Sequence, residues 1–309
     1  MTIIDKNSNI LLRLSEWSKD RFPIPNFISG ALSFITMILI GRFLNENQIV
    51  ALTQIDLIGI IAFVGHLLVL RVFDEHKDYK VDLINHPERV LSKGVITLTH
   101  LKYLALPFPM IAIFWSYLAD QSFGPTFFVW LLMFIYSVLM AKEFFIGKYL
   151  TKNLFIYSLS HMLVSPIMVL WPITAGLGKI DLTIPLIQYT LFISLASGLA
   201  YELTRKTRGQ DEDKNLDSYN KSFGTKISIS YISLLNLMTF ILGYLILEQI
   251  NSSLFYPKLI LFLGYTCTFY PTFNFLKKQT QKSRKINEGG IGLYFLFLYV
   301  AILITLIKA

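Results

Sequence analysis

The sequence predicts an all-α polytopic membrane protein. Of its 309 residues, 54% are hydrophobic and only 16% are charged, and the mean hydropathy is +0.54. Soluble domains usually contain roughly 25% charged residues, and a soluble chain of this length could not bury so much apolar surface. A lipid bilayer accepts such surface. Strands with alternating apolar residues, as in outer-membrane barrels, are not found.

Nine apolar runs, separated by charged residues or by proline and glycine, are the predicted membrane-spanning helices. Most are close to the ~20 residues that a helix needs to cross a bilayer. The second and fourth runs are shorter, and we expect both to continue as helix beyond the hydrocarbon. With no soluble domain between them, residues 1–309 are predicted to form one domain. The runs cover residues 23–44, 57–73, 101–119, 125–141, 154–176, 182–203, 227–247, 257–276 and 289–307.

Lysine and arginine residues are concentrated in one set of segments between these runs. Residues 1–22, 71–102, 142–152, 204–226 and 277–285 hold 24 of the 28 basic residues. Because basic loops stay in the cytoplasm, we expect the N-terminal segment and these loops on the cytoplasmic side of a cell inner or plasma membrane, and the C-terminus outside. The net charge of +8 is thus a topology signal. No segment interleaves basic residues with exposed aromatics, so no nucleic-acid partner is predicted.

The segment that precedes the first run resembles an interfacial helix. In residues 11–22, Leu11, Leu14 and Trp17 fall on one side and basic residues on the other. The polar residues inside the spans, His66, His161 and Asn236, are expected to be structural, hydrogen-bonded to neighbouring helices, rather than functional. The prolines at 107, 109, 166 and 172 are expected to kink the helices.

Acidic residues are concentrated in two of the charged loops, 73–100 and 204–226. In the first, Asp74, Asp78 and Asp82 are four residues apart and would form one stripe on a helix. Like charges at this spacing repel, which suggests a cation in front of them. Oxygen ligands without histidine or cysteine favour Mg²⁺, Mn²⁺ or Ca²⁺. Mg²⁺ typically binds a few carboxylates, several waters and a substrate phosphate.

The second acidic loop follows the sixth run, so both loops lie on the same side of the membrane. They are four helices apart, as expected if two helical halves face each other across a central cavity. Basic residues accompany the acids in both loops, and this combination suits a metal-bridged diphosphate whose tail enters the membrane. The alternative is that these basic residues only determine topology. The acids of this second segment are Glu202, at the end of the sixth run, and Asp211, Glu212, Asp213 and Asp217 in the loop.

The first acidic segment resembles the first motif of the UbiA superfamily of intramembrane prenyltransferases, which reads Asn-Asp-x-x-Asp-x-x-x-Asp and is followed by Arg-Pro…Gly. Here the segment is DEHKDYKVD (74–82), followed by ERVLSKG (88–94). Asp78, Asp82, Arg89 and Gly94 match. Asp74 replaces the Asn, residue 75 is Glu instead of Asp, and residue 90 is Val instead of Pro.

The second segment, YELTRKTRGQDEDKNLDSYNKSFG (201–224), resembles the second motif of a divergent branch of the superfamily, with a Glu-x-x-Arg-Lys…Asp-Glu-Asp pattern. Counting back from Phe223 and Gly224 places Tyr219 at the family's Thr and Asp211 near its second Asp. No carboxylate lies four residues before Asp211, where Thr207 stands. Glu202, or Asp213 with Asp217 in a shifted register, would then complete the second metal site.

The resemblance covers nearly the whole chain and implies nine helices around a cavity. It also implies transfer of a prenyl group from its diphosphate to a lipophilic, usually aromatic, acceptor. This reaction would depend on Mg²⁺ or Mn²⁺. Asp74, Asp78 and Asp82 would form one catalytic metal site, with Glu75 as a ligand or a support for the ligands. Asp211, Asp213 and Asp217 would form the other. The residues expected to bind substrate are Lys77, Arg89, Lys142, Glu202, Arg205 and Lys206. Of these, Arg89, Arg205 and Lys206 would hold the diphosphate, and Glu202 is also a candidate metal ligand.

Lys142 and Glu143 follow the fourth run, where the family often has a Tyr…Lys pair. Lys142 would reach phosphate and Glu143 would accept a proton from the acceptor, unless the two only anchor the helix at the interface. Two other functions stay open. One is a terpene cyclase of the same fold, in which the prenyl chain itself traps the cation. The other is a cation or lipid transporter, although the spans carry almost no charge at mid-depth.

Overall fold

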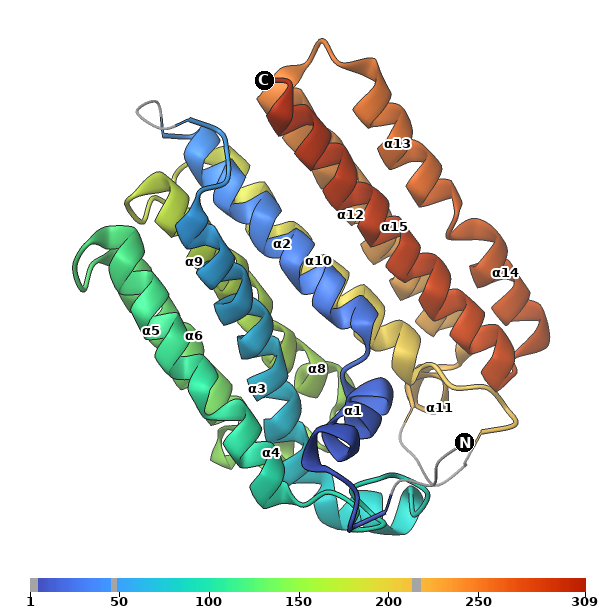
Figure 1. Ribbon diagram of the computed structural model, residues 1–309. Helices are drawn as coiled ribbons and strands as arrows, with labels where there is room; N and C mark the ends of the chain where they lie inside the picture. The colour runs from blue at the N-terminus through green and yellow to red at the C-terminus, as the bar shows by residue number, and fades with distance from the viewer. Residues whose placement is uncertain (1–4, 46–48, 213–217) are drawn as a thin grey trace. The chain divides into compact units, whose positions relative to one another are not determined.

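The computed structural model describes residues 5–45, 49–212 and 218–309, and over these ranges it contains helices and no strand (Figure 1). Eight helical segments of the described chain are long and apolar enough to cross a membrane, and a ninth, α6 (Pro125–Ala141), is apolar but shorter. The predicted polytopic all-α fold is therefore confirmed.

Five of the long spans are single helices and three are broken in the middle. The single helices are α2 (Ile24–Phe43), α3 (Gln54–Asn85), α10 (Pro185–Lys206), α12 (Thr225–Asn251) and α15 (Gln281–Ile307). The broken spans are α4 (Leu98–Ala105) with α5 (Pro107–Asp120), α8 (Leu154–Met162) with α9 (Val164–Leu177), and α13 (Phe255–Thr266) with α14 (Phe269–Lys278). The short elements outside the spans are α1 (Ile10–Arg21), η1 (Glu143–Phe145), α7 (Gly147–Leu150) and α11 (Tyr219–Phe223).

Helix α3 continues well beyond its apolar part, as predicted for the second run. It begins at a capping box, in which the backbone N–H of Thr53 donates to Asp56 Oδ2 at 2.6 Å. It is 32 residues long, or roughly 48 Å. It ends at Asn85, and His86 precedes a proline, a position that disfavours helical backbone. The last three turns therefore carry the acidic residues beyond the apolar segment.

The prediction that the helix continues beyond the hydrocarbon is wrong for the fourth run. Helix α6 ends at Ala141, and the three residues after Lys142 have φ values of 50°, 52° and 60°. This left-handed region is unfavourable for residues with a Cβ atom and cannot continue an α-helix. The chain therefore turns away directly after the apolar part of α6.

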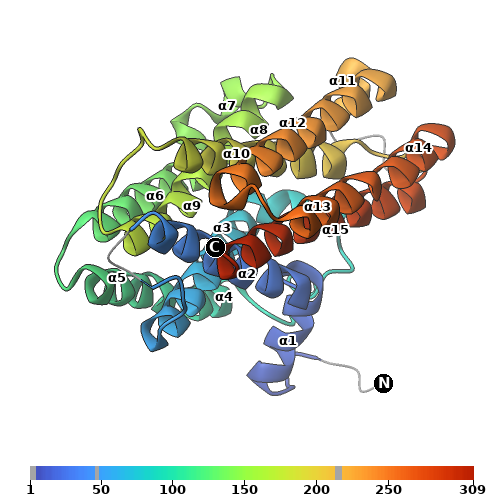
Figure 2. The same cartoon turned by 90° about the horizontal axis from the view of Figure 1, so that it is seen from above.

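The described chain forms two compact units. One consists of Met1–Ile35 and Leu52–Phe145, and the other of Thr36–Ala51 and Ile146–Ala309. Each unit carries one of the two acidic segments. In the first unit α5 packs against α3 and α6, and in the second α10 packs against α9 and α12 while α13 lies beside α15 (Figure 2).

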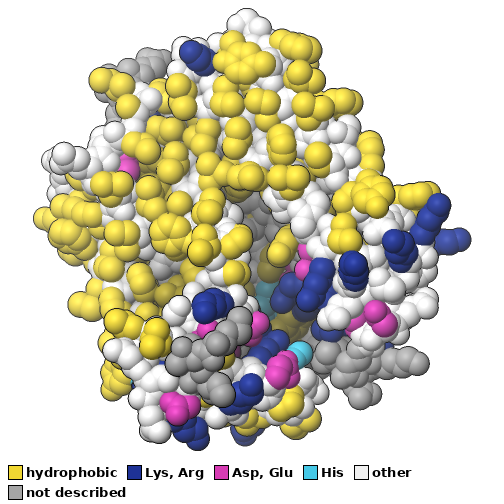
Figure 3. Space-filling model, turned by 45° about the vertical axis from the view of Figure 1, so that its right-hand side comes forward, with side chains coloured by type: hydrophobic (Ala, Val, Ile, Leu, Met, Phe, Trp, Pro, Cys, Tyr) yellow, Lys and Arg dark blue, Asp and Glu magenta, His cyan; other side chains and the backbone are white. Residues whose placement is uncertain are grey.

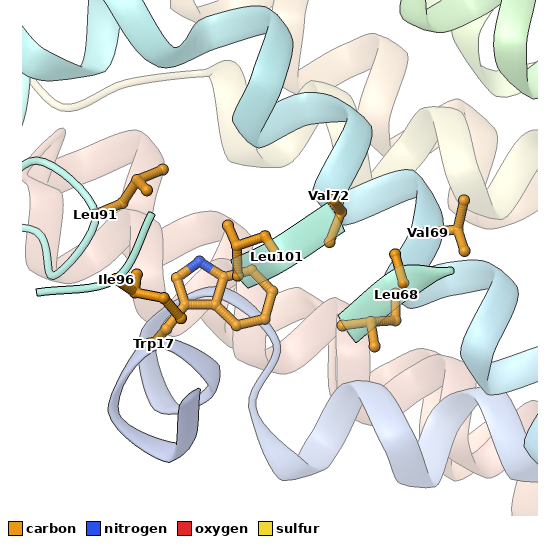
Figure 4. Packing of buried hydrophobic residues seen from close by; sticks show 8 residues of the cluster. Trp17, Leu68, Val69, Val72, Leu91, Ile96 and Leu101 are labelled. Carbon is orange, nitrogen blue, oxygen red and sulfur yellow. The ribbon is translucent and has the colours of Figure 1, made fainter. Parts of the chain in front are cut away.

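Helix α1 is anchored in the core of the first unit. Trp17 is 1% exposed and packs among Leu68, Val72 and Leu101 (Figure 4). Leu14 packs against the same cluster. Leu11, by contrast, is 70% exposed. The predicted helix exists, but the prediction that Leu11, Leu14 and Trp17 share one interfacial side is wrong, because Trp17 is buried in protein.

Close helix packing in the second unit depends on small residues. A Cβ atom on Gly41 of α2 would lie 2.3 Å from the backbone oxygen of Ile173 on α9, and one on Gly176 would lie 2.4 Å from that of Ile38. The two glycines thus let the backbones of α2 and α9 approach each other, as is common between membrane helices. Pro172 lies inside α9, and the break between α8 and α9 falls three residues before Pro166.

Candidate active site

The first acidic segment forms a stripe along the last turns of α3, as predicted. Asp82 accepts a hydrogen bond from Arg89 Nη1 at 2.5 Å, and Arg21 Nη2 lies 3.7 Å from the same carboxylate. Asp74 lies 3.6 Å from Lys77 Nζ. Asp78, between them, is half-buried and has no hydrogen bond or salt bridge to any described residue. Its carboxylate is therefore available to a ligand.

Glu75 lies in the interior of the first unit. Its side chain is 1% exposed and forms a short ion pair with Arg21 of α1, while Arg71 Nε lies 3.4 Å from the same oxygen. Of the two roles predicted for Glu75, this burial favours a support for the ligands. Sequence reasoning missed Arg21, although the basic residues on one side of the predicted N-terminal helix were a signal for it.

The loop that follows α3 places Arg89 against the stripe. Gly94 has a φ of 66°, a left-handed conformation that favours glycine. The backbone oxygen of the next residue, Val95, accepts a hydrogen bond from Arg13 Nη1 of α1 at 3.2 Å. Asp20 lies 4.0 Å from Arg89 Nε. Helix α1 therefore contacts both this loop and α3.

Glu143 lies near the stripe in the same unit. Lys142 is exposed at the end of α6 and Glu143 is partly buried. Glu143 is close enough to Asp78 for their charges to repel each other. The predicted proton acceptor thus lies near the carboxylate stripe.

The second acidic segment begins on the last turns of α10. Glu202 is 8% exposed and lies 2.7 Å from Arg205 Nη2 and 2.8 Å from Lys206 Nζ. The ammonium group of Lys206 also lies over the ring of Tyr157, 4.9 Å from its centre. Two predicted diphosphate-binding residues are therefore paired with a predicted ligand on the same helix.

Asp211 and Glu212 hold the start of α15. Asp211 Oδ1 accepts a hydrogen bond from the backbone N–H of Gln281 at 2.7 Å. Glu212 accepts two from Arg284, at 2.7 and 3.0 Å, and Arg284 also pairs with Glu288. Such paired bonds between a guanidinium and a carboxylate are strong and directional. Sequence reasoning did not assign a role to Glu212, Arg284 or Glu288, and the only signal was the charge at the start of the last run.

Tyr219, at the position of the family's Thr, is part of the packing of the second unit. It is 1% exposed, shares a short hydrogen bond with Ser158 Oγ, and donates one to the backbone oxygen of Leu154 at 3.2 Å. Burial raises the pKa of Tyr219 to about 12. The phenol therefore stays protonated at neutral pH.

The predicted metal ligands are only partly brought together. Asp213 and Asp217 lie outside the described residues. Among the residues that are described, no group of three or more His, Cys, Asp or Glu side chains is close enough to hold a metal ion. Charged side chains nevertheless gather in the lower part of the face shown in Figure 3, whereas hydrophobic side chains cover most of its upper part.

Of the polar residues within the spans, His66 forms the expected contact with a neighbouring helix. Its Nε2 lies 3.1 Å from Ser137 Oγ on α6, and both side chains are buried. His161 Nδ1 lies 2.8 Å from the backbone oxygen of Tyr157, one turn earlier on α8. His66 therefore contacts a neighbouring helix as expected, whereas this contact of His161 lies within its own helix.

Comparison with solved structures supports the resemblance at the level of the fold. A structure from work on digeranylgeranylglyceryl phosphate synthase in membranes aligns with a TM-score of 0.65 and 16% identity, over 96% of this chain and all of that one. The apo structure of a UbiA homolog from Aeropyrum pernix K1 aligns with a TM-score of 0.63 and 14% identity, over 87% of this chain and 97% of that one. No protein-family model and no curated sequence matches this chain. The predicted UbiA-like fold is thus confirmed.

Proposed function

We propose that this protein transfers a prenyl group from an allylic prenyl diphosphate to a lipophilic, aromatic acceptor within the membrane, with Mg²⁺ or Mn²⁺. The observation that carries the proposal is the carboxylate stripe on α3, which extends beyond the apolar part of a helix in a UbiA-like fold. Asp78, in the middle of the stripe, is repelled by the like charges of Asp74 and Asp82 and has no salt bridge to a described residue. Diphosphate chemistry with divalent metals supplies a neutralising partner.

The residues present fit a hard divalent cation that takes only one or two carboxylate ligands from the protein and the rest from water and phosphate. The stripe offers carboxylate oxygens only, and Asp78 has no competing salt bridge to a described residue. When bound, the metal would stabilise the negative charge that develops on the departing diphosphate. Asp74 and Asp82 are within the same three turns, and both are paired with basic residues that could turn toward phosphate oxygens.

Each acidic segment has basic side chains of its own that could bind phosphate oxygens. Arg89 now pairs with Asp82, and Arg205 and Lys206 pair with Glu202. A diphosphate would compete for these donors, and arginine can bind its oxygens through two parallel bonds. Apolar and aromatic walls would exclude water from the allyl cation, whose positive charge aromatic faces stabilise.

The test is mass spectrometry of lipid extracts from cells that express the wild-type protein or Asp78→Asn. We expect a prenylated lipid that depends on the wild-type protein and is lost in the variant. Asp181→Asn is the matched control, because Asp181 lies in the loop between α9 and α10 and bonds to Thr183 at 2.6 Å. An identical lipid profile for wild type and Asp78→Asn would contradict the proposal.

Purified protein separates the other functions. A hydrocarbon or prenol product formed from prenyl diphosphate without acceptor would indicate a terpene cyclase. Metal-dependent ion or lipid flux that survives Asp78→Asn and Asp82→Asn, with no turnover, would indicate a transporter.

A further inference from the structure

A groove in the second unit is lined by none of the predicted site residues. Helix α12 forms one wall and helices α13 and α14 form the other, and the groove has a volume of about 860 Å³. This is within the ~300–1,000 Å³ usual for small-molecule sites. None of the acidic or basic residues assigned to the diphosphate site lines it. The groove is therefore a candidate binding site for a separate ligand.

The groove extends from one end of α12 into the membrane. Lys226 lines its rim and is the single charged residue among the described lining residues. Asn236 lines it ten residues further along, or roughly 15 Å deeper. This distance is about half the ~30 Å thickness of the hydrocarbon. The inner end of the groove is therefore near mid-depth, where lipid headgroups and water do not reach.

Asn236 lacks a partner at that depth. Its side chain is 2% exposed, and Oδ1 accepts no hydrogen bond from any described residue. Nearby polar groups of the same unit are paired: Thr239 Oγ1 lies 2.9 Å from the Tyr294 hydroxyl, and Thr272 Oγ1 donates to Asn287 Oδ1 at 3.0 Å. An unpaired amide in hydrocarbon is costly, so a donor from a ligand would be favourable.

Aromatic side chains line the same groove as this amide. Tyr265 and Phe269 line the groove, with ring centres 5.1 Å apart in an edge-to-face arrangement, and Phe273 lines it one turn further along α14. Such rings favour a further aromatic ring. A charged ligand would be unfavourable at this depth.

We propose that this groove binds an uncharged phenolic lipid, whose ring lies against Tyr265 and Phe269 and whose hydroxyl donates a hydrogen bond to Asn236. The alkyl chain of the lipid follows the apolar part of the groove. The sequence favours a purely structural role for Asn236, whereas the structure leaves its amide without a structural partner. The proposal concerns binding only and does not depend on the proposed transfer reaction.

Two probes test it: 4-decylphenol, which has the hydroxyl, and decylbenzene, which lacks it. Binding is measured with the full-length protein in nanodiscs of zwitterionic lipid, by thermal unfolding and by competition with radiolabelled 4-decylphenol. We expect 4-decylphenol to raise Tm and to bind about tenfold more tightly than decylbenzene, since one hydrogen bond to a buried polar group distinguishes them.

Asn236→Leu removes the amide at similar volume. We expect this variant to have a Tm equal to or above that of the wild type and to bind both probes with the same affinity. Ser230→Ala is the control, because Ser230 lines the outer part of the groove and its hydroxyl already bonds to the backbone oxygen of Lys226 at 3.0 Å. This control should retain the tenfold preference for the phenol.

Ser233→Phe tests the location if Asn236→Leu does not fold. Ser233 is an exposed residue of the groove wall, so a phenyl ring there should fill the groove and abolish the binding of 4-decylphenol. Equal affinity of the two probes for the wild type would overturn the proposal. So would an unchanged preference in Asn236→Leu or in Ser233→Phe, or displacement of the phenol by anionic phospholipid alone.

Discussion

Removal of the Glu75 carboxylate should destabilise the first unit by about 3 kcal/mol. Glu75 is 1% exposed, and the side chains of its partners Arg21 and Arg71 are 14% and 20% exposed. Removing one partner of a buried ion pair costs ~3–5 kcal/mol. Both arginines keep a more distant carboxylate, with Asp82 3.7 Å from Arg21 and Asp74 3.8 Å from Arg71. Because of these secondary partners and the partial exposure, we expect the lower end of that range for Glu75→Ala.

The assay is equilibrium unfolding of purified protein in mixed micelles, with SDS as denaturant and tryptophan fluorescence as signal, to which the buried Trp17 contributes. Arg21→Ala and the double variant complete a thermodynamic cycle. We expect a coupling free energy between residues 21 and 75 of about 1–3 kcal/mol.

The control is Glu16→Ala. Glu16 pairs with Lys19 at 2.8 Å, but these side chains are 39% and 69% exposed. An exposed pair of this kind contributes less than about 1 kcal/mol. If Glu75→Ala costs no more than Glu16→Ala, or if residues 21 and 75 show no coupling, the stabilising role of the buried ion pair between Arg21 and Glu75 is refuted.

Three further results are expected. Burial raises the pKa of Tyr219 to about 12, above the usual ~10. The contribution of Tyr219 to stability should therefore be complete below pH 10 and lost as the pH rises toward 12. Tyr219→Phe should lack this loss of stability at alkaline pH in unfolding titrations. Gly41→Ala should lower Tm strongly, because the added Cβ would lie 2.3 Å from a backbone oxygen of α9, whereas Gly289→Ala, with no atom within 4 Å, should not. Arg284→Gln should loosen residues 209–212, measured as faster amide hydrogen exchange, because Glu212 loses its bidentate partner; unchanged exchange there would contradict this role.

Composition and local spacing were sufficient to predict the spans and the stripe on α3. Apolar runs of about twenty residues determine the membrane helices, and the four-residue spacing of Asp74, Asp78 and Asp82 determines their shared face. The helix after the fourth run was mispredicted, because no glycine or proline directly after Ala141 marks the left-handed turn at residues 143–145.

Contacts between residues distant in sequence could not be predicted. Arg21 is 54 residues from Glu75, and Glu212 is 72 residues from Arg284. Each of these residues has closer charges along the chain with which it could have paired. Which charges pair depends on how the helices pack, and a single sequence does not give that packing. The burial of Trp17 was missed for the same reason, since an interfacial helix and a docked one have the same pattern.

The central claim is that the carboxylate stripe supports metal-dependent cleavage of a prenyl diphosphate. The most direct measurement is pyrophosphate release by purified protein from C10–C20 prenyl diphosphates, with a lipophilic aromatic acceptor and increasing Mg²⁺. We expect release that needs Mg²⁺, stops on addition of a chelator, and falls at least a hundredfold in Asp78→Asn at unchanged Tm. Release that is independent of the metal, or that is equal in Asp78→Asn and the wild type, would contradict the claim.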